Sequence, residues 1–429
     1  MDIQIQELME NLNHPDVSIR LESLKRLMDK IKDGQLDKPV KKSDVNNHIH
    51  TTYSFSPYSP AKAIWMAFQA GLATAGIMDH DSISGAEEFI EAGKIAGIAT
   101  TIGVELRVDF SHTLLSGKKI NNPDQNSVAY MALHGIPHTQ INRVKEFCKP
   151  CTNWRNERNR LMTTKINDIL PPVLHLDFDR DIVPASNFAD GGSITERHIL
   201  YALSVKMIQT YGKGRPLLDF MKNLLKLNIN SKTEAFLLDL QNPYYAYDLL
   251  GLLKSELVGS FYIDAATECP EVSEVIQFSD AIGAISAYAY LGDVGDSVTG
   301  DKKAQKFEDD YIETLFKVIK ALGFKAVTYM PSRNTMEQLD RLRKLCEQYD
   351  FFQISGEDIN SPRQPFICNA LRNEKFKNLI DAAWALVGHE LAATKHLDKG
   401  MFSKASMAEY PDLESRINAF KHIGLENLK

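Results

Sequence analysis

Short apolar segments alternate with amphipathic segments along most of the chain from residue 44 onward. The apolar segments have the length of β-strands, and the segments between them have the 3.6-residue periodicity of α-helices. Strand–helix–strand alternation of this kind builds a mainly parallel sheet. The predicted strands cover 45–50, 74–78, 99–110, 281–290, 326–330 and 351–355. The predicted helices cover 59–70, 84–96, 309–322 and 336–348.

This alternation divides the 429 residues into a barrel-sized α/β region with three helical additions. One large α/β barrel with insertions is compatible with such a length. Residues 44–365 are assigned to the barrel, and the charged stretch 140–270 is assigned to a helical insertion that covers the barrel mouth. Residues 1–43 and 366–429 are predicted to be helical extensions, the first of them a helical pair docked on the barrel.

Composition and charge argue against several classes of protein. The formal net charge is −7 at pH 7, whereas a broad nucleic-acid-binding face shows as a basic excess. Five sparsely placed cysteines do not form the framework of a disulfide-rich secreted domain. The start of the chain does not read as a secretory signal, and no apolar run reaches membrane-spanning length. We therefore predict a cytoplasmic protein with no membrane partner, for which nucleic acid is an unfavoured ligand.

Histidines and carboxylates gather at the ends of the predicted strands. His48 and His50 are two residues apart, so both side chains project from the same side of a strand. Later strands end in Asp79-His80-Asp81, contain Gly103-Val104-Glu105, or run into Gly356-Glu357-Asp358. The carboxyl ends of parallel barrel strands converge on one face, where active sites lie. Imidazole and carboxylate groups suit Zn, Mn or Fe, so a metal site is predicted there.

These motifs resemble the polymerase and histidinol phosphatase (PHP) domain family. The segment HIHTTYSFSPYSPAKAIWMAFQAGLATAGIMDHDSISGAEE is similar to the family's opening, which reads His-x-His-Thr and then Asp-His-Asp, followed by Gly-x-Glu. The family closes with Gly-Ser-Asp-x-His. The resemblance covers roughly residues 44–140 and 280–365, and is closest to the metal-dependent phosphoesterases that carry a helical insertion. It implies a distorted seven-stranded β/α barrel and up to three metal ions.

Carried over position by position, the resemblance implies a first metal site with all of its ligands present: His48, His50, Glu105 and Asp358. A second site would share Glu105 and use His134, and a third would use His80. Three other ligand positions of the family are changed, one from aspartate and two from histidine: Phe55, Tyr288 and Asn360. Because the losses are uneven, we predict one tightly held divalent ion (Mn, Zn or Fe) and a weaker second.

Three residues outside the ligand set are predicted to contact a substrate phosphate: His198, Arg333 and Arg363. His198 lies in a segment similar to one in the family branch, although a structural hydrogen bond at a helix start would also explain it. The two arginines follow predicted barrel strands, and the arginine fork suits phosphate. The arginines of the insertion are instead interpreted as a solvated helix face: Arg155, Arg158 and Arg160.

The leading functional hypothesis is hydrolysis of a small phosphorylated metabolite or nucleotide. A metal at the first site would lower the pKa of a bound water toward neutrality, which makes the water a nucleophile. The altered ligand positions motivate an alternative, a barrel that binds metal and ligand in a regulatory or interaction role without efficient catalysis. A third hypothesis, exonuclease activity on nucleic acid, is disfavoured by the acidic net charge.

Overall fold

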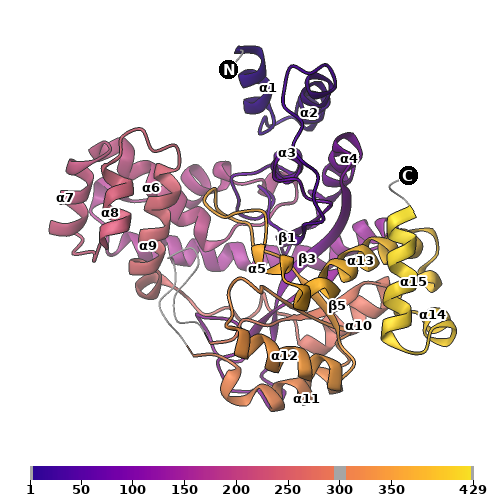
Figure 1. Cartoon of the computed structure of the whole chain (residues 1–429). Coiled ribbons are helices and arrows are strands. Elements are labelled where there is room, and N and C mark those ends of the chain that lie inside the picture. Colours follow the sequence, from indigo (N-terminus) through magenta and orange to yellow (C-terminus); the bar gives the residue numbers. More distant parts are fainter. Residues whose placement is uncertain (1–2, 294–305, 427–429) are drawn as a thin grey trace.

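The computed structural model describes residues 3–293 and 306–426, and within them seven strands form one sheet (Figure 1). Their spatial order follows the chain, from β1 to β7. The strands are β1 Val45–Ile49, β2 Thr74–His80, β3 Ala99–Asp109, β4 Val128–His134, β5 Ile285–Ala289, β6 Ala326–Tyr329 and β7 Phe352–Ser355.

The sheet curves into a nearly closed barrel. A parallel bridge between Ile49 and Ile359 brings the end of β1 beside the chain that follows β7. Neighbouring strands run parallel except at β4, which is antiparallel to both β3 and β5. The predicted α/β barrel is therefore confirmed. The strand pattern had not revealed β4, which reverses direction and belongs to no strand–helix–strand unit.

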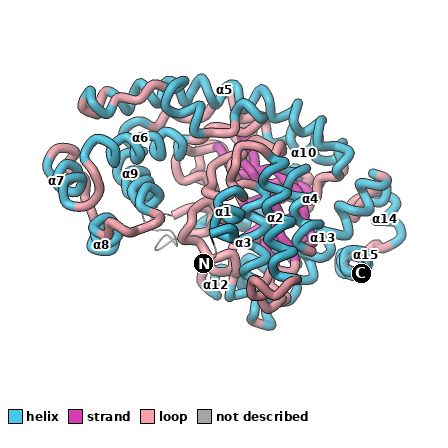
Figure 2. Tube along the Cα trace, turned by 90° about the horizontal axis from the view of Figure 1, so that it is seen from above, coloured by secondary structure: helices cyan, strands magenta, loops and turns pink. Residues whose placement is uncertain are grey.

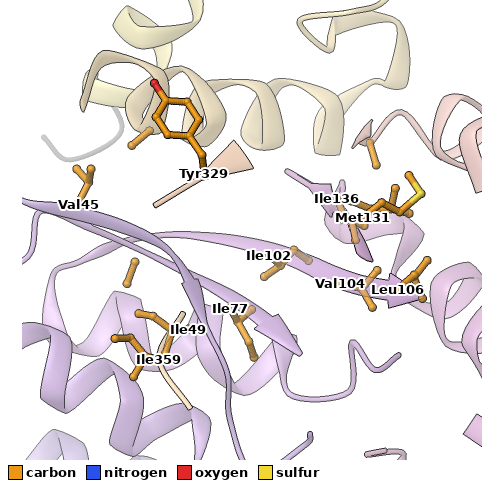
Figure 3. Packing of buried hydrophobic residues seen from close by; sticks show 14 of the residues in the cluster. Val45, Ile49, Ile77, Ile102, Val104, Leu106, Met131, Ile136, Tyr329 and Ile359 are labelled. Carbon is orange, nitrogen blue, oxygen red and sulfur yellow. The ribbon is translucent and has the colours of Figure 1, made fainter. Parts of the chain in front are cut away.

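Helices surround the barrel, so the strands lie at the centre when the molecule is seen from above (Figure 2). The helices that follow barrel strands are α3 Pro60–Ala70, α4 Ala86–Ala96, α11 Ile312–Leu322 and α12 Met336–Gln348, and α10 Val272–Ile282 precedes β5. The start of α3 is fixed by Ser59, whose side chain accepts from the amide of Lys62, and by Pro60 in the first turn. Apolar side chains such as Ile49, Ile77 and Ile359 pack between the strands and these helices (Figure 3).

The N-terminal helices α1 Ile3–Asn11 and α2 Val17–Lys32 pack against each other, and α2 packs against α3 and α4. Their junction contains a buried ion pair, because Nη2 of Arg20 lies 2.6 Å from Oε2 of Glu88 in α4. The same guanidinium donates to the carbonyl oxygens of His14 and Pro15 in the α1–α2 turn. One arginine therefore ties the turn of the helical pair to the barrel.

The C-terminal segment forms α13 Lys377–Lys395, α14 Lys404–Glu409 and α15 Leu413–Glu426. Helix α13 contacts β1, β3 and β7, and Oε2 of Glu390 accepts from the amide of Ile102 at 2.7 Å. Buried residues of α13 share a core cluster with inward-facing residues of the barrel such as Phe352 and Ala287. The C-terminal extension is thus part of the barrel core rather than a peripheral tail.

The insertion is helical and includes the group of helices on the left in Figure 1. It has a hydrophobic core of its own. Its helices are α5 Ile141–Asn167, α6 Glu196–Tyr211, α7 Arg215–Asn223, α8 Ser231–Leu238 and α9 Tyr245–Phe261. The prediction of a solvated face was wrong for Arg155 and Arg158, whose side chains are 2% and 6% exposed. Both arginines are buried because carboxylates from the barrel and from the 262–271 segment meet them.

Candidate metal centre

His48 and His50 lie at the carboxyl end of β1, with ring centroids 5.0 Å apart. A register shift between Asn46 and Ile49 interrupts the regular pairing of β1 with β2 just before this end. Gly356, after β7, comes so close that a Cβ there would lie 2.6 Å from Cβ of His48. A glycine at this position therefore allows the end of β7 to reach the two histidines.

The carboxylate of Glu105 is the centre of the cluster. Its Oε2 atom lies 2.9 Å from Nδ1 of His80, 3.8 Å from Nε2 of His48 and 4.0 Å from Nε2 of His50. Glu105 is in the middle of β3, and His80 is opposite it in the β2–β3 register. Parallel pairing therefore brings the second and third motifs into contact.

Asp358 approaches from the segment after β7, and its Oδ1 atom lies 3.1 Å from Nε2 of His50. The side-chain amide of Asn360 donates to the same Oδ1 at 2.7 Å. The neighbouring Glu357 points elsewhere, since its Oε1 accepts from Oγ of Ser332 at 2.6 Å. Asp358, and not Glu357, is thus the carboxylate that this segment presents to the histidines.

Hydrogen bonds around the cluster orient His50. Its Nδ1 atom lies 3.3 Å from Oγ of Ser54, and this hydroxyl donates to Oδ1 of Asp79 at 2.6 Å. Asp79 also accepts from the amide and the hydroxyl of Thr51. A ring held at Nδ1 presents Nε2 to a ligand, as in metal sites where outer hydrogen bonds fix the histidine.

Electrostatics keep the Asp358 carboxylate ionised and most of the imidazoles neutral. Burial alone would raise the pKa of Asp358, but His50 and His48 hold it well below its usual value. Burial lowers the pKa of His48, and burial together with the nearby His50 lowers that of His80 strongly. Burial would also lower the pKa of His50, but Asp358 and Glu105 raise it. Anionic carboxylates and neutral imidazoles are the forms that bind metal ions.

The donor set fits a divalent metal. Two groups of three residues have ligand atoms within 4.8 Å of one another: His48 with His50 and Asp358, and His50 with His80 and Glu105. Nε2 of His50 is buried, and none of the described residues gives it a well-aligned hydrogen bond. Imidazole nitrogens and carboxylate oxygens converging in this way match a site for Zn, Mn or Fe. The structure also groups His80 with His50 and Glu105, whereas the sequence comparison had assigned His80 to a separate third site.

His134, at the end of β4, is buried close to this cluster but belongs to neither group. Burial, with a smaller contribution from His48, lowers its pKa to about 3. Its Nε2 atom has no hydrogen-bond partner among the described residues. The structure therefore leaves His134 as a neutral nitrogen donor beside the cluster, and its role as a ligand of a second metal remains a prediction.

Two of the altered ligand positions do not contribute donors. Tyr288 is fully buried, and its hydroxyl donates to Glu308. The next residue, Ala289, lines the cavity, so Tyr288 points to the opposite face of β5. The sequence left open whether Tyr288 could serve as a ligand, and in the structure its hydroxyl contacts Glu308 instead of the histidine cluster. Phe55 packs edge-on against His198 and near Tyr247 in the core of the insertion, where it joins the insertion to the barrel.

A cavity of about 130 Å³ opens beside the cluster and is shared by the barrel and the insertion. The barrel lines it with His48, His80, Glu105, Asp358 and Asn360 among others. The insertion contributes the start of α6, at Thr195, Glu196 and Arg197, and Lys254 of α9. The predicted phosphate-contacting residue Arg333 also lines the cavity.

The other two predicted phosphate contacts have structural roles. His198 is the third residue of α6, and its Nδ1 accepts from the amide of Thr195 at 3.0 Å in a capping arrangement. Burial lowers its pKa to about 4. Arg363 donates to both carboxylate oxygens of Asp248 at 2.6 and 2.7 Å. Neither residue lines the cavity.

Sequence reasoning missed three basic residues of the cavity wall: Arg107, Arg197 and Lys254. Arg107 lies two residues after Glu105, so strand alternation could have placed both side chains on one face. Arg197 is the neighbour of His198, and only the helical turn decides which of the two faces the cavity.

The family model for the PHP domain matches residues 46–327. The chain belongs to the PHP domain family. The match confirms the resemblance drawn from the motifs at the strand ends. The matched range spans the helical insertion at 140–270.

Two solved structures resemble this PHP domain protein. A protein from Bifidobacterium adolescentis, named as a metal-dependent phosphoesterase, has a TM-score of 0.51 at 17% identity and is matched over 80% of this chain and 98% of its own. An amidohydrolase from Chromobacterium violaceum, with bound sulfate and no metal, has a TM-score of 0.49 at 14% identity over 76% and 90%. The first likeness shows a shared fold. No curated protein sequence matches the chain, and no described helix is long and apolar enough to cross a membrane.

Proposed function

We propose that this PHP domain protein is a metal-dependent hydrolase of small phosphate esters. The observation that carries the proposal is a largely buried cluster of three histidines and two carboxylates that opens into a cavity lined by four basic side chains. A divalent ion held by His48, His50, Glu105 and Asp358, with His80 beside them, would supply a Lewis acid and an activated water.

The charge of the cavity favours an anionic substrate. Among the described residues, four basic side chains line it: Arg107, Arg197, Lys254 and Arg333. Four acidic side chains also line it: Glu105, Asp124, Glu196 and Asp358. Glu105 and Asp358 belong to the metal centre, so a bound cation would neutralise them and leave the basic residues in excess. An arginine fork offers paired donors to phosphate oxygens, which is the role proposed for Arg333 and Arg197.

The partial cover over the cavity supports a small substrate. Its walls come from both the barrel and the insertion, which places the metal centre below a partly covered opening. A long nucleic-acid strand would need an open groove with a basic surface beyond the cavity, and the net charge of −7 disfavours such a surface. A phosphorylated metabolite or a single nucleotide is therefore the substrate class that we propose.

The alternative, binding without turnover, draws its support from Phe55 and Tyr288, which supply no ligand. The two functions differ in a simple measurement. A hydrolase releases inorganic phosphate from a panel of phosphorylated metabolites with added Mn²⁺, at a rate that saturates with substrate. A binding protein gives saturable binding of the same compounds and no phosphate above the background of metal-free buffer.

The metal content is expected to be one tightly bound ion and a weaker second per chain. The reason is that the two candidate groups share His50, and that Phe55 and Asn360 stand at two ligand positions of the family's third site. Elemental analysis after dialysis, and again after incubation with Mn²⁺, measures both occupancies. Three ions per chain at full occupancy would contradict the prediction.

Arg333→Ala is expected to raise KM for a phosphate ester about 10-fold, because one charge-assisted contact with phosphate is lost. The metal content is expected to stay unchanged, since Arg333 belongs to neither ligand group. Arg160→Ala is the control, because Arg160 pairs with Asp179 on the surface of α5 and does not line the cavity. Equal KM values for both variants and the unmodified protein would remove Arg333 from the phosphate site.

A further inference from the structure

Buried charged side chains join the barrel to the insertion along one wall of the cavity. The cations are Arg107 of β3, Arg155 and Arg158 of α5 and Lys254 of α9. The carboxylates are Asp81 after β2, Glu196 at the start of α6 and Glu268 before α10. Ion pairs no longer than 4 Å connect all of these residues. Buried charges at this density are costly unless each of them is matched.

Glu268 holds the arginines in place. It accepts from Nε and Nη2 of Arg158 at 2.7 and 2.9 Å and from Nη1 of Arg107 at 3.2 Å. Nε of Arg155 lies 3.5 Å from the same carboxylate, and the other end of Arg155 pairs with Asp81. Three guanidinium groups thus share one carboxylate at the junction of barrel and insertion.

Three members of this network line the cavity, Arg107, Glu196 and Lys254, and Arg107 is the one on the same strand as Glu105 of the metal centre. Its Nε donates to the hydroxyl of Tyr130 at 3.0 Å and its Nη1 to Glu268. Its Nη2 faces Oε2 of Glu196 at 3.6 Å, which is longer than a hydrogen bond. Two of the three guanidinium nitrogens therefore fix the position of Arg107, and within the described residues the third meets only Glu196, at the longer distance.

Glu196 is a loose counter-ion of Arg107. Its Oε1 pairs with Nζ of Lys254 at 3.2 Å, but its Oε2 is buried without a hydrogen-bond partner among the described residues. Burial alone would raise the pKa of Glu196, but Lys254 and Arg107 hold it well below its usual value. A buried anionic oxygen without a donor is unfavourable, so this arrangement is poised to exchange one anion for another.

The balance of charge in this network also favours the binding of an anion. The described network has four cations and three carboxylates, so it carries one positive charge in excess. Thr195, Glu196 and Arg197 place the N-terminus of the 16-residue helix α6 at the cavity wall, and helix N-termini favour anions. The excess charge and the helix end thus face the same part of the cavity.

We propose that Arg107 and Lys254 form an anion subsite that binds a negatively charged group of the substrate, with Glu196 as the resident counter-ion that this group displaces. The inference rests on the proposed function. Glu105 and Arg107 are two residues apart on one face of β3, so their Cα atoms lie about 7 Å apart along the strand. Arg107 is therefore a specificity-determining residue next to the metal centre, and Glu268 is the residue that positions it.

The test uses inorganic phosphate as the probe and calorimetry on the full chain loaded with Mn²⁺. Arg107→Met is expected to weaken phosphate binding about 10- to 100-fold, because a charge-assisted contact is lost. Glu196→Gln is expected to tighten binding about 3- to 10-fold, because the competing carboxylate becomes neutral while its volume is kept. Damage to the fold would weaken binding in both variants, so the opposite signs separate an anion subsite from a structural network.

Elemental analysis accompanies each titration, and the metal content is expected to match that of the unmodified protein. Arg160→Met is the matched control, and its phosphate affinity is expected to be unchanged. If Arg107→Met does not fold, Arg107→Lys replaces it, and a several-fold loss of affinity is expected because the fork is lost while the charge is kept.

Unchanged affinity in Arg107→Met, or weaker binding in Glu196→Gln at full metal content, would overturn the subsite. These outcomes are independent of the proposed function. A protein that hydrolyses no phosphate ester but shows the opposite changes in affinity keeps the anion subsite and loses the hydrolase assignment. A protein that turns over phosphate esters with no change in either variant keeps the assignment and loses the subsite.

Discussion

Asp358→Asn is expected to empty the metal centre and to lower any phosphoesterase rate at least about 100-fold, since an anionic ligand and the electrostatic stabilisation that depends on it are both lost. Asp358 supplies the carboxylate closest to His50, at 3.1 Å. An amide of the same size keeps the shape of the segment but offers a neutral oxygen. Metal content by elemental analysis and the rate of phosphate release measure the two effects, with circular dichroism to show that the fold is kept.

Glu357→Gln is the matched control for this experiment. Glu357 is the adjacent residue and is buried, but its carboxylate accepts a hydrogen bond from Ser332 and faces away from the histidines. The change is therefore expected to leave metal content unaltered. An empty site in Glu357→Gln with a full site in Asp358→Asn would show that the assignment of the closing motif is displaced by one residue.

Arg20→Met is expected to destabilise the docking of α1 and α2 by about 3–5 kcal/mol, the usual cost of removing one partner from a buried ion pair. Both carboxylate oxygens of Glu88 accept from Arg20, at 2.8 and 2.6 Å, and both side chains are at most 4% exposed. The variant leaves the Glu88 charge buried without its counter-charge. Hydrogen exchange of the α1 and α2 amides, followed in increasing urea, reports this local free energy.

The double variant Arg20→Met with Glu88→Gln is expected to be more stable than Arg20→Met alone, because the buried negative charge is then also removed. Glu88 accepts from the amide of Ala61 as well, so a glutamine keeps an oxygen for that bond. Equal protection of α1 and α2 in the single and double variants would show that the pair contributes little to the docking.

The candidate ligands could be predicted because they follow strands whose directions are evident from the sequence. His48, His50, His80 and Asp358 lie at or just after the ends of parallel strands, and Glu105 is opposite His80 in the β2–β3 register, so their convergence at one end of the barrel follows from the strand order. Their contacts in the structure, from 2.9 to 4.0 Å around Glu105, are a consequence of that topology.

The roles of residues off the parallel strands could not be predicted in the same way. His198 and Arg197 are neighbours, and the turn of α6 gives the capping bond to one and the cavity to the other. Tyr288 was aligned with a ligand position, but the pleat of β5 turns its ring outward toward Glu308. A shift of one residue turns a side chain to a different face of its strand or helix, and matching a sequence motif does not resolve a shift of that size.

By itself, the sequence determined the α/β alternation, the helical insertion and the set of candidate metal ligands, because each of these follows from periodicity or from motifs along a single element. Only the tertiary structure decided which charges are buried. Arginine is a residue type that usually lies on the surface. At the junction of barrel and insertion, however, the carboxylates of Glu268 and Asp81 pair with three buried arginines: Arg107, Arg155 and Arg158. Arginine burial depends on counter-charges that are distant in sequence, so no local pattern could have revealed it.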